Sequence, residues 1–493
     1  MNILKKPTSR GTGLWRYRGL KKWFALVLAY YTLWASLFIN VQPIYAVDFS
    51  WARFQSITIN KDGSIYPPDI RVSRNGSVYT LTSDIFNSYY LNVQCDNITL
   101  DGAGHTLEGP PYAIFSTATY PDIAIVIQSN DVTVKNFNIK YFGAGIAVSG
   151  NENSFVSNIQ IFQNNISNTG VFRGDSESGI WVQYSNNTQI FHNNISNNGV
   201  NDYYNSGILV QHSANIRIFQ NNITGNYNGG IRLDTRKSGG LPINDVNRVK
   251  IEQNNIAGNG VGIWLDSSDT QIIQNNITEN SNSGVVAGGG ANTFLGNYFL
   301  NNGVGIGIVS WDNLIVGNMF RNNDGFAVTL GGGQNNTFYL NDFIDNKGLN
   351  LQVSNPWWNG PETNIWDSGS MGNYWSDYFS RYPNATSLDG SGIGDTPFFI
   401  NPNNIDRYPL TEPYSIIMPI TSLSPSPTST ASPSTSPSPS PSPTPSVSQQ
   451  PTTSPRPSAS SISTTEIALV IVTVVVAVSV AAVAISKRRK RQA

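Results

Sequence analysis

The chain has 493 residues, which is longer than one ordinary domain, so several regions are expected. Its formal net charge is -1, but both ends are basic, and residues 47–420 carry 17 basic and 30 acidic side chains, a formal charge of -13. This acidic body argues against nucleic acid as a partner, because phosphate binding needs a clustered basic surface. A single cysteine, Cys95, excludes a disulfide framework within the chain and any cysteine-rich metal site.

Residues 1–46 are predicted to be a secretory signal peptide. A basic segment ends at Lys22, an apolar run extends from Trp23 to Ile39, and Ala46 offers a cleavage point. An uncleaved N-terminal membrane anchor is the alternative, because the apolar run nearly spans a bilayer. Under both interpretations the body of the protein faces outward.

The middle of the chain is rich in asparagine, since 41 of the 59 asparagines lie between residues 151 and 350. One six-residue motif recurs there: an apolar residue, two residues of any type, an asparagine, one residue of any type and a second apolar residue. Its asparagines are 29, 28, 33, 21, 22, 21 and 23 residues apart, and a period near 21 with longer steps indicates a solenoid with looped-out insertions. The recurring asparagines are Asn164, Asn193, Asn221, Asn254, Asn275, Asn297, Asn318 and Asn341.

A second motif, glycine–apolar–any–apolar, occurs once in each repeat. Its alternation is typical of a strand with one buried face, and no helical stripe of comparable length appears in the body. We therefore predict an all-β fold, a parallel β-helix over residues 96–354 with an N-terminal cap at 47–95 and a C-terminal cap at 355–420. The expected buried pairs are Ile146/Val148, Ile180/Val182, Ile208/Val210, Ile231/Leu233, Ile263/Leu265, Val285/Ala287, Ile306/Ile308 and Phe326/Val328.

The recurring asparagine has two expected roles. Asparagine adopts left-handed backbone geometry more readily than most residues, which suits a turn between strands. Neighbouring strands lie about 4.8 Å apart, so its amide can also bond to the same amide one coil away. We expect a structural ladder of asparagines here rather than a ligand site.

These coils resemble the right-handed parallel β-helix repeats that pectate lyases share with NosD-type surface and periplasmic proteins of bacteria and archaea. The first coil, Asn97–Leu107, is similar to the NosD-like opening. More specific are three closing motifs, Asn364–Tyr378, Asp389–Pro397 and Asp406–Leu410, which look like the NosD-like C-terminal signature. The resemblance covers roughly residues 95–412.

The outward positions of the middle coils suggest a ligand-binding surface. The residue between each buried pair, and the residue after the pair, should form two columns on one face of the solenoid. Exposed tryptophans stack on sugar rings and polar side chains bond to hydroxyls, so we expect a polysaccharide groove, with an ordinary sheet surface as the alternative. The candidate ligand-binding residues are Trp181, Gln183, Gln211, Arg232, Asp234, Trp264 and Asp266.

The same face holds the candidates for catalysis. Asp234 and Asp266 lie on adjacent coils, so their carboxylates could be about 5 Å apart, as in a retaining glycosidase, and Arg232 could stabilise a uronate in a lyase. Against an enzyme, no Gly-His-Gly or Asp-Asp pattern of the β-helix polygalacturonases occurs, and acid pairs on solenoid faces are often only solvated charge. A carbohydrate-active enzyme therefore remains the alternative to a binding protein.

Two features of the sequence bear on metal binding, the resemblance to NosD and a glycine-rich loop. The resemblance to NosD implies copper, but copper sites need His, Met and Cys, and the chain has three scattered histidines, one cysteine and few methionines. Asp389, Ser391 and Asp395 lie in a glycine-rich loop that resembles a Ca²⁺ loop, although the family form has an aspartate in place of Ser391. A glycine-rich turn without metal is the alternative, and no cofactor is required.

Glycosylation is a further expectation for an exported body. Nine Asn-any-Ser/Thr sequons occur, and an asparagine-rich repeat produces some of them by chance. The sequon asparagines are Asn75, Asn97, Asn165, Asn186, Asn194, Asn222, Asn276, Asn335 and Asn384.

The C-terminal region is predicted to anchor the protein. Residues 421–465 are mostly Ser, Thr and Pro and are expected to form an extended stalk, either O-glycosylated or a plain linker. Residues 466–486 are predicted to be a transmembrane helix, and the basic tail 487–493 places it with its C-terminus in the cytoplasm. The sequence thus predicts a membrane-anchored cell-surface β-helix protein that binds polysaccharide or envelope partners. A purely structural envelope component is the third interpretation.

Overall fold

The computed structural model describes residues 55–86, 89–109, 123–170, 178–199, 205–235, 246–348, 352–354 and 363–414. Within these ranges no helix is both long and apolar enough to cross a membrane. The predicted signal peptide or anchor, the stalk, the segment 466–486 and the basic tail all lie outside the described residues.

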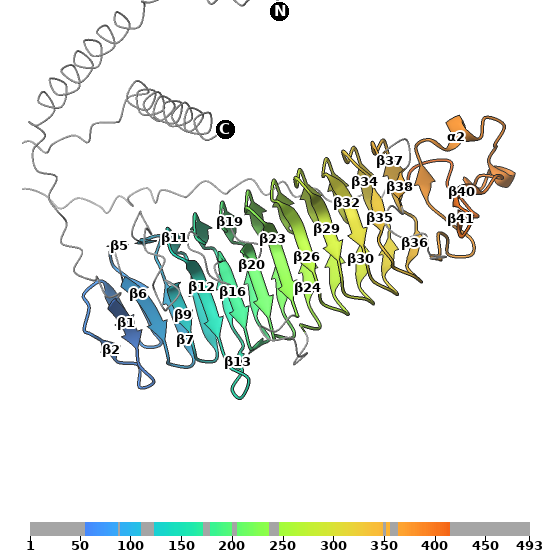
Figure 1. Cartoon of the computed structure of the whole chain (residues 1–493). Helices are drawn as coiled ribbons and strands as arrows, with labels where there is room; N and C mark the ends of the chain where they lie inside the picture. The colour runs from blue at the N-terminus through green and yellow to red at the C-terminus, as the bar shows by residue number, and fades with distance from the viewer. Residues whose placement is uncertain are drawn as a thin grey trace, which may run out of the picture. The chain divides into compact units, whose positions relative to one another are not determined.

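The described residues form three long, mainly parallel sheets, to which each coil contributes one strand in turn (Figure 1). We name them sheets A, B and C. Sheet A runs in the order β2 (Ile65–Tyr66), β1 (Gln55–Ile59), β6 (Tyr89–Val93), β9 (Ile123–Ile127), β12 (Ala144–Ser149), β16 (Ile180–Gln183), β20 (Ser206–Gln211), β23 (Gly229–Asp234), β26 (Val261–Leu265), β29 (Ser283–Ala287), β32 (Val304–Ile308), β35 (Val328–Leu330) and β38 (Val353–Ser354).

Sheets B and C follow the same course with shorter strands. Sheet B holds β3 (Val72–Asn75), β4 (Val78–Leu81), β7 (Ile98–Asp101), β10 (Val132–Lys135), β14 (Gln160–Phe162), β18 (Gln189–Phe191), β21 (Arg217–Phe219), β24 (Lys250–Glu252), β27 (Gln271–Ile273), β30 (Thr293–Leu295), β33 (Leu314–Val316) and β36 (Thr337–Tyr339). Sheet C holds β5 (Ile85–Phe86), β8 (Thr106–Glu108), β11 (Asn138–Lys140), β15 (Asn165–Ser167), β19 (Asn194–Ser196), β22 (Asn222–Thr224), β25 (Asn255–Ala257), β28 (Asn276–Thr278), β31 (Tyr298–Leu300), β34 (Met319–Arg321), β37 (Asp342–Ile344) and β39 (Tyr374–Trp375).

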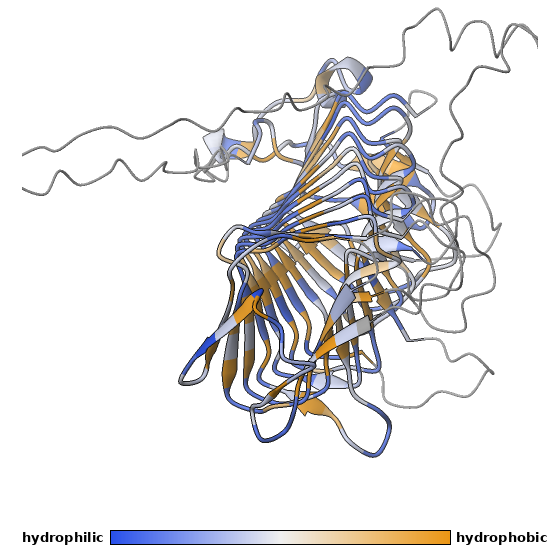
Figure 2. Ribbon diagram, turned by 90° about the vertical axis from the view of Figure 1, so that its left-hand side faces the viewer, coloured by the Kyte–Doolittle hydropathy of each residue, from blue (hydrophilic) through white to orange (hydrophobic). Residues whose placement is uncertain are grey.

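The core lies inside the coils because alternate residues of every strand point inward. In sheet B, for example, Ile161, Ile190 and Ile218 stack in register and are fully buried, while their neighbours face outward. Hydrophobic and hydrophilic residues accordingly alternate along the strands (Figure 2). This is the alternation that predicted the all-β solenoid.

The last predicted buried pair, Phe326/Val328, is only half correct, because Val328 is buried but its inward-facing partner is Leu330 and not Phe326. Val328 and Leu330 lie opposite Ile306 and Ile308, and Ala327 takes the place that glycine occupies in earlier coils. Phe326 is only half-buried, and its ring lies so close to Gly348 that a Cβ there would come within 2.3 Å of it. The bulky ring therefore packs outside the inward column.

The turn between sheets B and C carries the eight recurring asparagines. Each is buried, and its Nδ2 donates to the Oδ1 of the corresponding asparagine one coil onward at 2.9–3.0 Å. The predicted left-handed geometry is misplaced by one residue, because the positive φ belongs to the preceding residue, for example Gln220 at 53°. That residue makes the sharp bend, and the asparagine that follows can then point inward.

A second column of buried asparagines, which the sequence repeat did not predict, follows the strands of sheet C. It begins at Thr169, and each member again bonds to the next coil. Its members are Asn198, Asn226, Asn259, Asn280, Asn302, Asn323 and Asn346, and it ends on Gln352.

The C-terminal part covers the last coil with aromatic rings. Trp366 stacks on Phe338 and Trp375 on Phe343, with ring centroids 4.2 and 4.4 Å apart, and both indoles are buried. Of the two interpretations of this segment, these tryptophans fit the cap; Trp357 and Trp358 lie outside the described residues. The remaining elements are α2 (Tyr378–Arg381), η1 (Leu388–Gly390), the hairpin β40 (Phe398–Asn401) and β41 (Asn404–Asp406), and the small pair β13 (Val156–Ser157) and β17 (Ser185–Asn186).

Candidate functional site

The predicted ligand-binding residues lie together on the outer face of sheet A. Trp181, Leu209, Arg232 and Trp264 occupy one register position on four successive strands, β16, β20, β23 and β26. The neighbouring position holds Gln183, Gln211 and Asp234, and Asp266 follows directly after β26. The sequence therefore placed these side chains in the correct columns.

The middle of this face is not open, which corrects the expectation of an exposed groove there. Leu209 is fully buried, and Arg232 and Asp234 are only 4% and 2% exposed. Trp181 and Trp264 are half-buried. A strand pattern tells which side of a sheet a residue occupies but not what covers that side, so burial of the middle coils could not be read from it.

Arg232 organises the charges of this face. Its Nε lies 3.7 Å from Oδ2 of Asp234, its Nη2 lies 3.9 Å from Oδ2 of Asp266, and its guanidinium carbon is 5.5 Å from the Trp264 ring centre. One guanidinium thus balances two carboxylates that would otherwise repel each other on adjacent coils. The catalytic candidates Asp234 and Arg232 are buried, and Asp266 is the partly exposed member.

The tryptophan farther toward the N-terminus is held by its indole. Nε1 of Trp181 donates to Oε1 of Gln211 at 3.0 Å, which fixes the ring across the two coils β16 and β20. The polar group of the indole is thereby satisfied within the protein, as is usual for half-buried tryptophan.

The exposed part of sheet A lies toward the C-terminus, and the sequence reasoning missed it. Val309 and Trp311 follow β32 and are 50% and 54% exposed. Their neighbours one coil earlier are glycines: Gly288 stands opposite Val309, and Ala291, the residue after Gly290, donates its backbone N–H to the carbonyl of Trp311. Because Gly288 and Gly290 add no side chain beside them, Val309 and Trp311 stand above a bare backbone surface.

Glycine at position 288 also makes room for the acid. A Cβ there would lie 2.9 Å from Oδ1 of Asp266, so the exposed surface begins where the Arg232 network ends. The available sequence signal was the glycine triplet 288–290 one coil before a tryptophan, which lies beyond the strand columns used to find the site.

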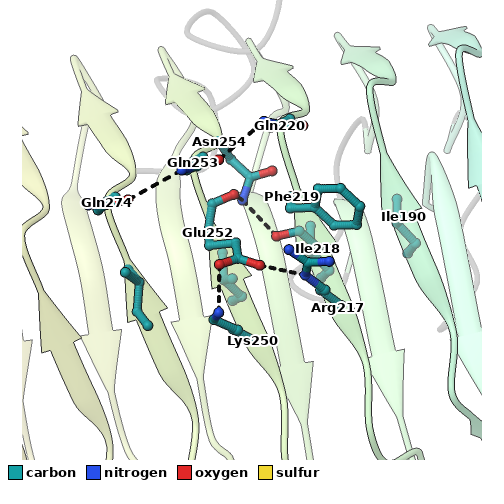
Figure 3. A network of polar contacts seen from close by, with 12 residues as sticks. Ile190, Arg217, Ile218, Phe219, Gln220, Lys250, Glu252, Gln253, Asn254 and Gln274 are labelled. Carbon is teal, nitrogen blue, oxygen red and sulfur yellow. Dashed lines mark hydrogen bonds and ion pairs between the residues drawn. The ribbon is translucent and has the colours of Figure 1, made fainter. Parts of the chain in front are cut away.

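A network of polar side chains lies on the outer face of sheet B (Figure 3). Glu252 accepts hydrogen bonds from Nε of Arg217 at 2.5 Å and from Nζ of Lys250 at 2.7 Å. Burial opposes ionisation of Glu252, but the two cationic donors outweigh it and hold the pKa of the carboxyl below its usual value. Beside it, Gln220, Gln253 and Gln274 form a chain of amide hydrogen bonds at 3.1 and 3.3 Å.

The predicted calcium loop is closed by its own hydrogen bonds. Ser391 donates its hydroxyl to the carbonyl of Leu388, and Asp389 adopts a left-handed conformation in η1. The carboxylate of Asp395 accepts the hydroxyl and the backbone N–H of Thr386, and these bonds lower its pKa. Calcium binding by Asp389, Ser391 and Asp395 stays a prediction.

The sequon asparagines lie at the surface; three of them bond to one another, and a fourth, Asn276, joins the row through Asn255. Seven are exposed, whereas Asn186 and Asn222 are half-buried. On sheet C, Asn276 and Asn222 donate to Asn255 and Asn194 at 2.8 Å, and Asn194 donates to Asn165 at the same distance. Since glycans attach to the same Nδ2 atoms that donate in this row, glycosylation there would replace ladder hydrogen bonds.

The chain is similar to one protein family and, at low identity, to several solved structures. A family model described as periplasmic copper-binding protein (NosD) matches residues 96–310 and 239–380. Among curated proteins, no sequence matches the chain. The periplasmic alginate epimerase AlgG is similar in structure, with a TM-score of 0.43 at 12% identity over 64% of this chain and 82% of that one.

Two other solved structures are similar to the chain at the same low level. The A-module of the mannuronan C-5 epimerase AlgE4 from Azotobacter vinelandii has a TM-score of 0.37 at 14% identity, covering 58% of this chain and 88% of that one. The tailspike protein of E. coli bacteriophage HK620, solved with a pentasaccharide, has a TM-score of 0.38 at 13% identity, covering 60% and 55%.

The described residues do not fit the copper that the family description implies. Copper in proteins is held by grouped His, Met and Cys ligands. Here His105 pairs with Asp84, His192 bonds to Gln220, and His212 stacks on Tyr184. Within the part of the chain that the structure describes, no three His, Cys, Asp or Glu side chains are grouped so as to hold a metal ion.

Proposed function

We propose a function for this chain from the premise that it belongs to the NosD family of right-handed parallel β-helix proteins, whose model matches more than half of its length. The proposal is that it is a cell-surface protein, anchored through residues 466–486, whose β-helix binds a polysaccharide along the C-terminal half of the outer face of sheet A.

The single observation that carries the proposal is the pair Val309 and Trp311. Both side chains are half exposed over glycine positions, on the same sheet as the half-buried Trp264. Large exposed aromatics mark contact surfaces, and an indole offers a sugar ring an apolar face together with a hydrogen-bond donor. A bare backbone beside the ring lets a flat pyranose approach it closely.

The charge of this surface favours a neutral polysaccharide. Asp266 lies at the edge of the glycine surface and shares Arg232 with Asp234, so the group of three carries a formal charge of -1. The body as a whole is acidic as well. A polymer with many carboxylates would be repelled here unless a divalent cation such as Ca²⁺ bridged it.

Binding is favoured over catalysis because of where the acids lie. A retaining glycosidase needs two carboxyl groups that both reach the scissile bond. Asp234 is 2% exposed and is held beside Arg232, so it cannot reach a polymer lying on the surface. We therefore assign Asp234 and Arg232 to support of Trp264 and Asp266.

The test measures binding of neutral polysaccharides such as β-glucan, mannan and galactan to the full-length protein in detergent. Trp264→Ala with Trp311→Ala should lose roughly 2 kcal/mol, about thirtyfold in Kd, because buried aromatic anchors dominate such contacts. Tyr227→Ala removes another exposed ring outside the surface and should leave Kd unchanged. Tight binding that survives the double substitution would contradict the proposal, and release of reducing ends would favour an enzyme.

A further inference from the structure

A row of three phenylalanines lies on the outer face of sheet B. Phe162, Phe191 and Phe219 occupy one register position on β14, β18 and β21. Their rings are stacked, with centroids 4.7 and 4.8 Å apart and planes inclined by 16° and 8°. We call these three residues the aromatic strip. Because each ring covers the face of the next, the strip presents mainly ring edges to a ligand.

The strip ends on a fixed cation. Glu252 stands opposite Phe219 on β24, and the guanidinium of Arg217 lies over the Phe219 ring at 4.1 Å while its Nε bonds to Glu252. The stacking and the ion pair together fix the plane of a side chain that is still 49% exposed. Within the described residues, no protein acceptor takes the hydrogens of its two amino groups.

Lys250 adds a second exposed cation to the same end. Its Nζ bonds to Glu252, and its side chain is 41% exposed. Two cations share one carboxylate, so the cluster has a formal charge of +1 on a body whose formal charge is -13. Figure 3 shows Arg217 and Lys250 converging on Glu252 from adjacent strands.

One border of the strip is a line of hydrogen-bonding groups. His192 bonds to Gln220 at 2.8 Å, and the amides of Gln220, Gln253 and Gln274 continue the chain over the next coils. His192, Gln253 and Gln274 are exposed. Groups repeated once per coil suit a ligand that is itself a repeating polymer lying along the solenoid axis.

We propose that the aromatic strip and its basic end bind an acidic polysaccharide, with a uronate carboxylate on Arg217 and Lys250. Two features argue for an anion. Aromatic ring edges are the positive part of the ring quadrupole, and a guanidinium held by one nitrogen still offers a fork of donors that matches a carboxylate. The border of amides bonds to the sugar hydroxyls.

This site is separate from the surface proposed on sheet A, and its ligand differs in charge. Trp264 and Trp311 lie beside Asp266, whereas the strip ends on two cations. The two proposals can therefore fail independently, since neutral and acidic polymers report on different sheets.

The experiment compares polygalacturonate with its fully methyl-esterified form, which has the same backbone without the charges. Full-length protein in detergent should bind the acid form and bind the ester at least tenfold more weakly. Arg217→Gln should weaken binding of the acid form about tenfold, as expected for loss of one charge-assisted contact, and added salt should weaken binding by the unchanged protein.

Two matched variants keep the test decisive if Arg217→Gln disturbs folding. Arg321→Gln removes one charge from an exposed position on β34 and should leave binding of polygalacturonate unchanged. Arg217→Lys keeps the charge and loses the fork, so it should lie between Arg217→Gln and the unchanged protein. The proposal would be overturned if acid and ester bound equally, or if Arg217→Gln and Arg321→Gln weakened binding equally. It would also be overturned if Arg217→Gln changed only the self-association of the protein.

Discussion

At the corner between sheets B and C, the ladder of recurring asparagines is accompanied by a row of asparagines one residue later in the sequence. We call the ladder the inner column and this row the outer column. The inner column contains Asn221, which is fully buried, and the outer column contains Asn222, which is half-buried. Asn221 donates to the amide oxygen of Asn254 on the next coil at 3.0 Å, whereas Asn222 accepts from the amide of Asn255 on the next coil at 2.8 Å. Comparing the two columns separates the stability that amide-to-amide hydrogen bonds contribute from the stability gained when the amides also bond to buried backbone groups.

The amides of the inner column also bond to backbone groups. Nδ2 of Asn221 donates to the carbonyls of Ile190 and Phe219 as well as to Asn254, and its Oδ1 accepts both the backbone N–H and the amide of Asn193. The two carbonyls lie in strands β18 and β21 of sheet B, and the backbone N–H of Asn193 lies in the turn from sheet B to sheet C. In the outer column, by contrast, the side-chain hydrogen bonds of Asn222 within the described residues go to the amides of Asn194 and Asn255, and water can replace them because Asn222 is half-buried.

The largest effect is expected when the inner column is broken. Asn221→Ala should lower the free energy of unfolding by about 4 kcal/mol, because it removes the amide that donates to the carbonyls of Ile190 and Phe219 and accepts the backbone N–H of Asn193. The measurement is the midpoint and slope of urea unfolding followed by circular dichroism. A loss below about 1 kcal/mol would mean that water or a shifted turn replaces the amide.

The sequence predicted the inner column because identity and spacing repeat together. The same reasoning stopped at Asn341, although the ladder continues to Asn373 at 2.9 Å and then to Asp406. The next step along the chain is 32 residues, and the final member is not an asparagine. A ladder whose last member changes residue type has no periodic signature, and only packing of the cap reveals it.

The functional surfaces were harder to predict for a related reason. The sequence predicted the columns of outward residues on sheet A correctly. The burial of Asp234 and the exposure of Trp311, however, depend on which other residues cover each strand. The cluster of Arg217 and Glu252 comes from residues 35 apart that look like ordinary solvated charges in the sequence. Only the coil register brings Phe219 and Glu252 opposite each other.

A smaller effect is expected where the inner column ends on Asp406. Burial raises the pKa of this carboxyl to about 7, although Trp375, Asn373 and Tyr408 donate hydrogen bonds to it. The ordinary value in an unfolded chain is about 3.9, so the folded protein binds the extra proton between these limits. The contribution of Asp406 to stability should therefore be largest at acidic pH and fall as pH rises from about 4 to about 7, by on the order of 3 kcal/mol.

The test is a pH series of urea unfolding for the unchanged protein and for Asp406→Asn. The amide cannot titrate, so the variant should lose most of the decline between pH 4 and 7, whatever its absolute stability. Asp342→Asn is the matched control at a carboxyl whose pKa burial raises to about 6, and it should remove only a smaller part of the decline. Parallel pH curves for Asp406→Asn and the unchanged protein would show that Asp406 does not titrate in this window.

The smallest effect is expected in the outer column, and it completes the comparison. Asn222→Ala removes one amide that accepts from Asn255 and donates to Asn194, both at 2.8 Å. Because these partners lie at the surface, water takes over their hydrogen bonds, and the free energy of unfolding should change by no more than about 0.5 kcal/mol. Both variants are measured in the same urea series. The ratio of their losses in free energy of unfolding gives the part of the Asn221→Ala loss that is due to buried backbone groups. If the two substitutions cost the same, the amide-to-amide ladder itself stabilises the solenoid, and the backbone groups that Asn221 bonds to contribute little.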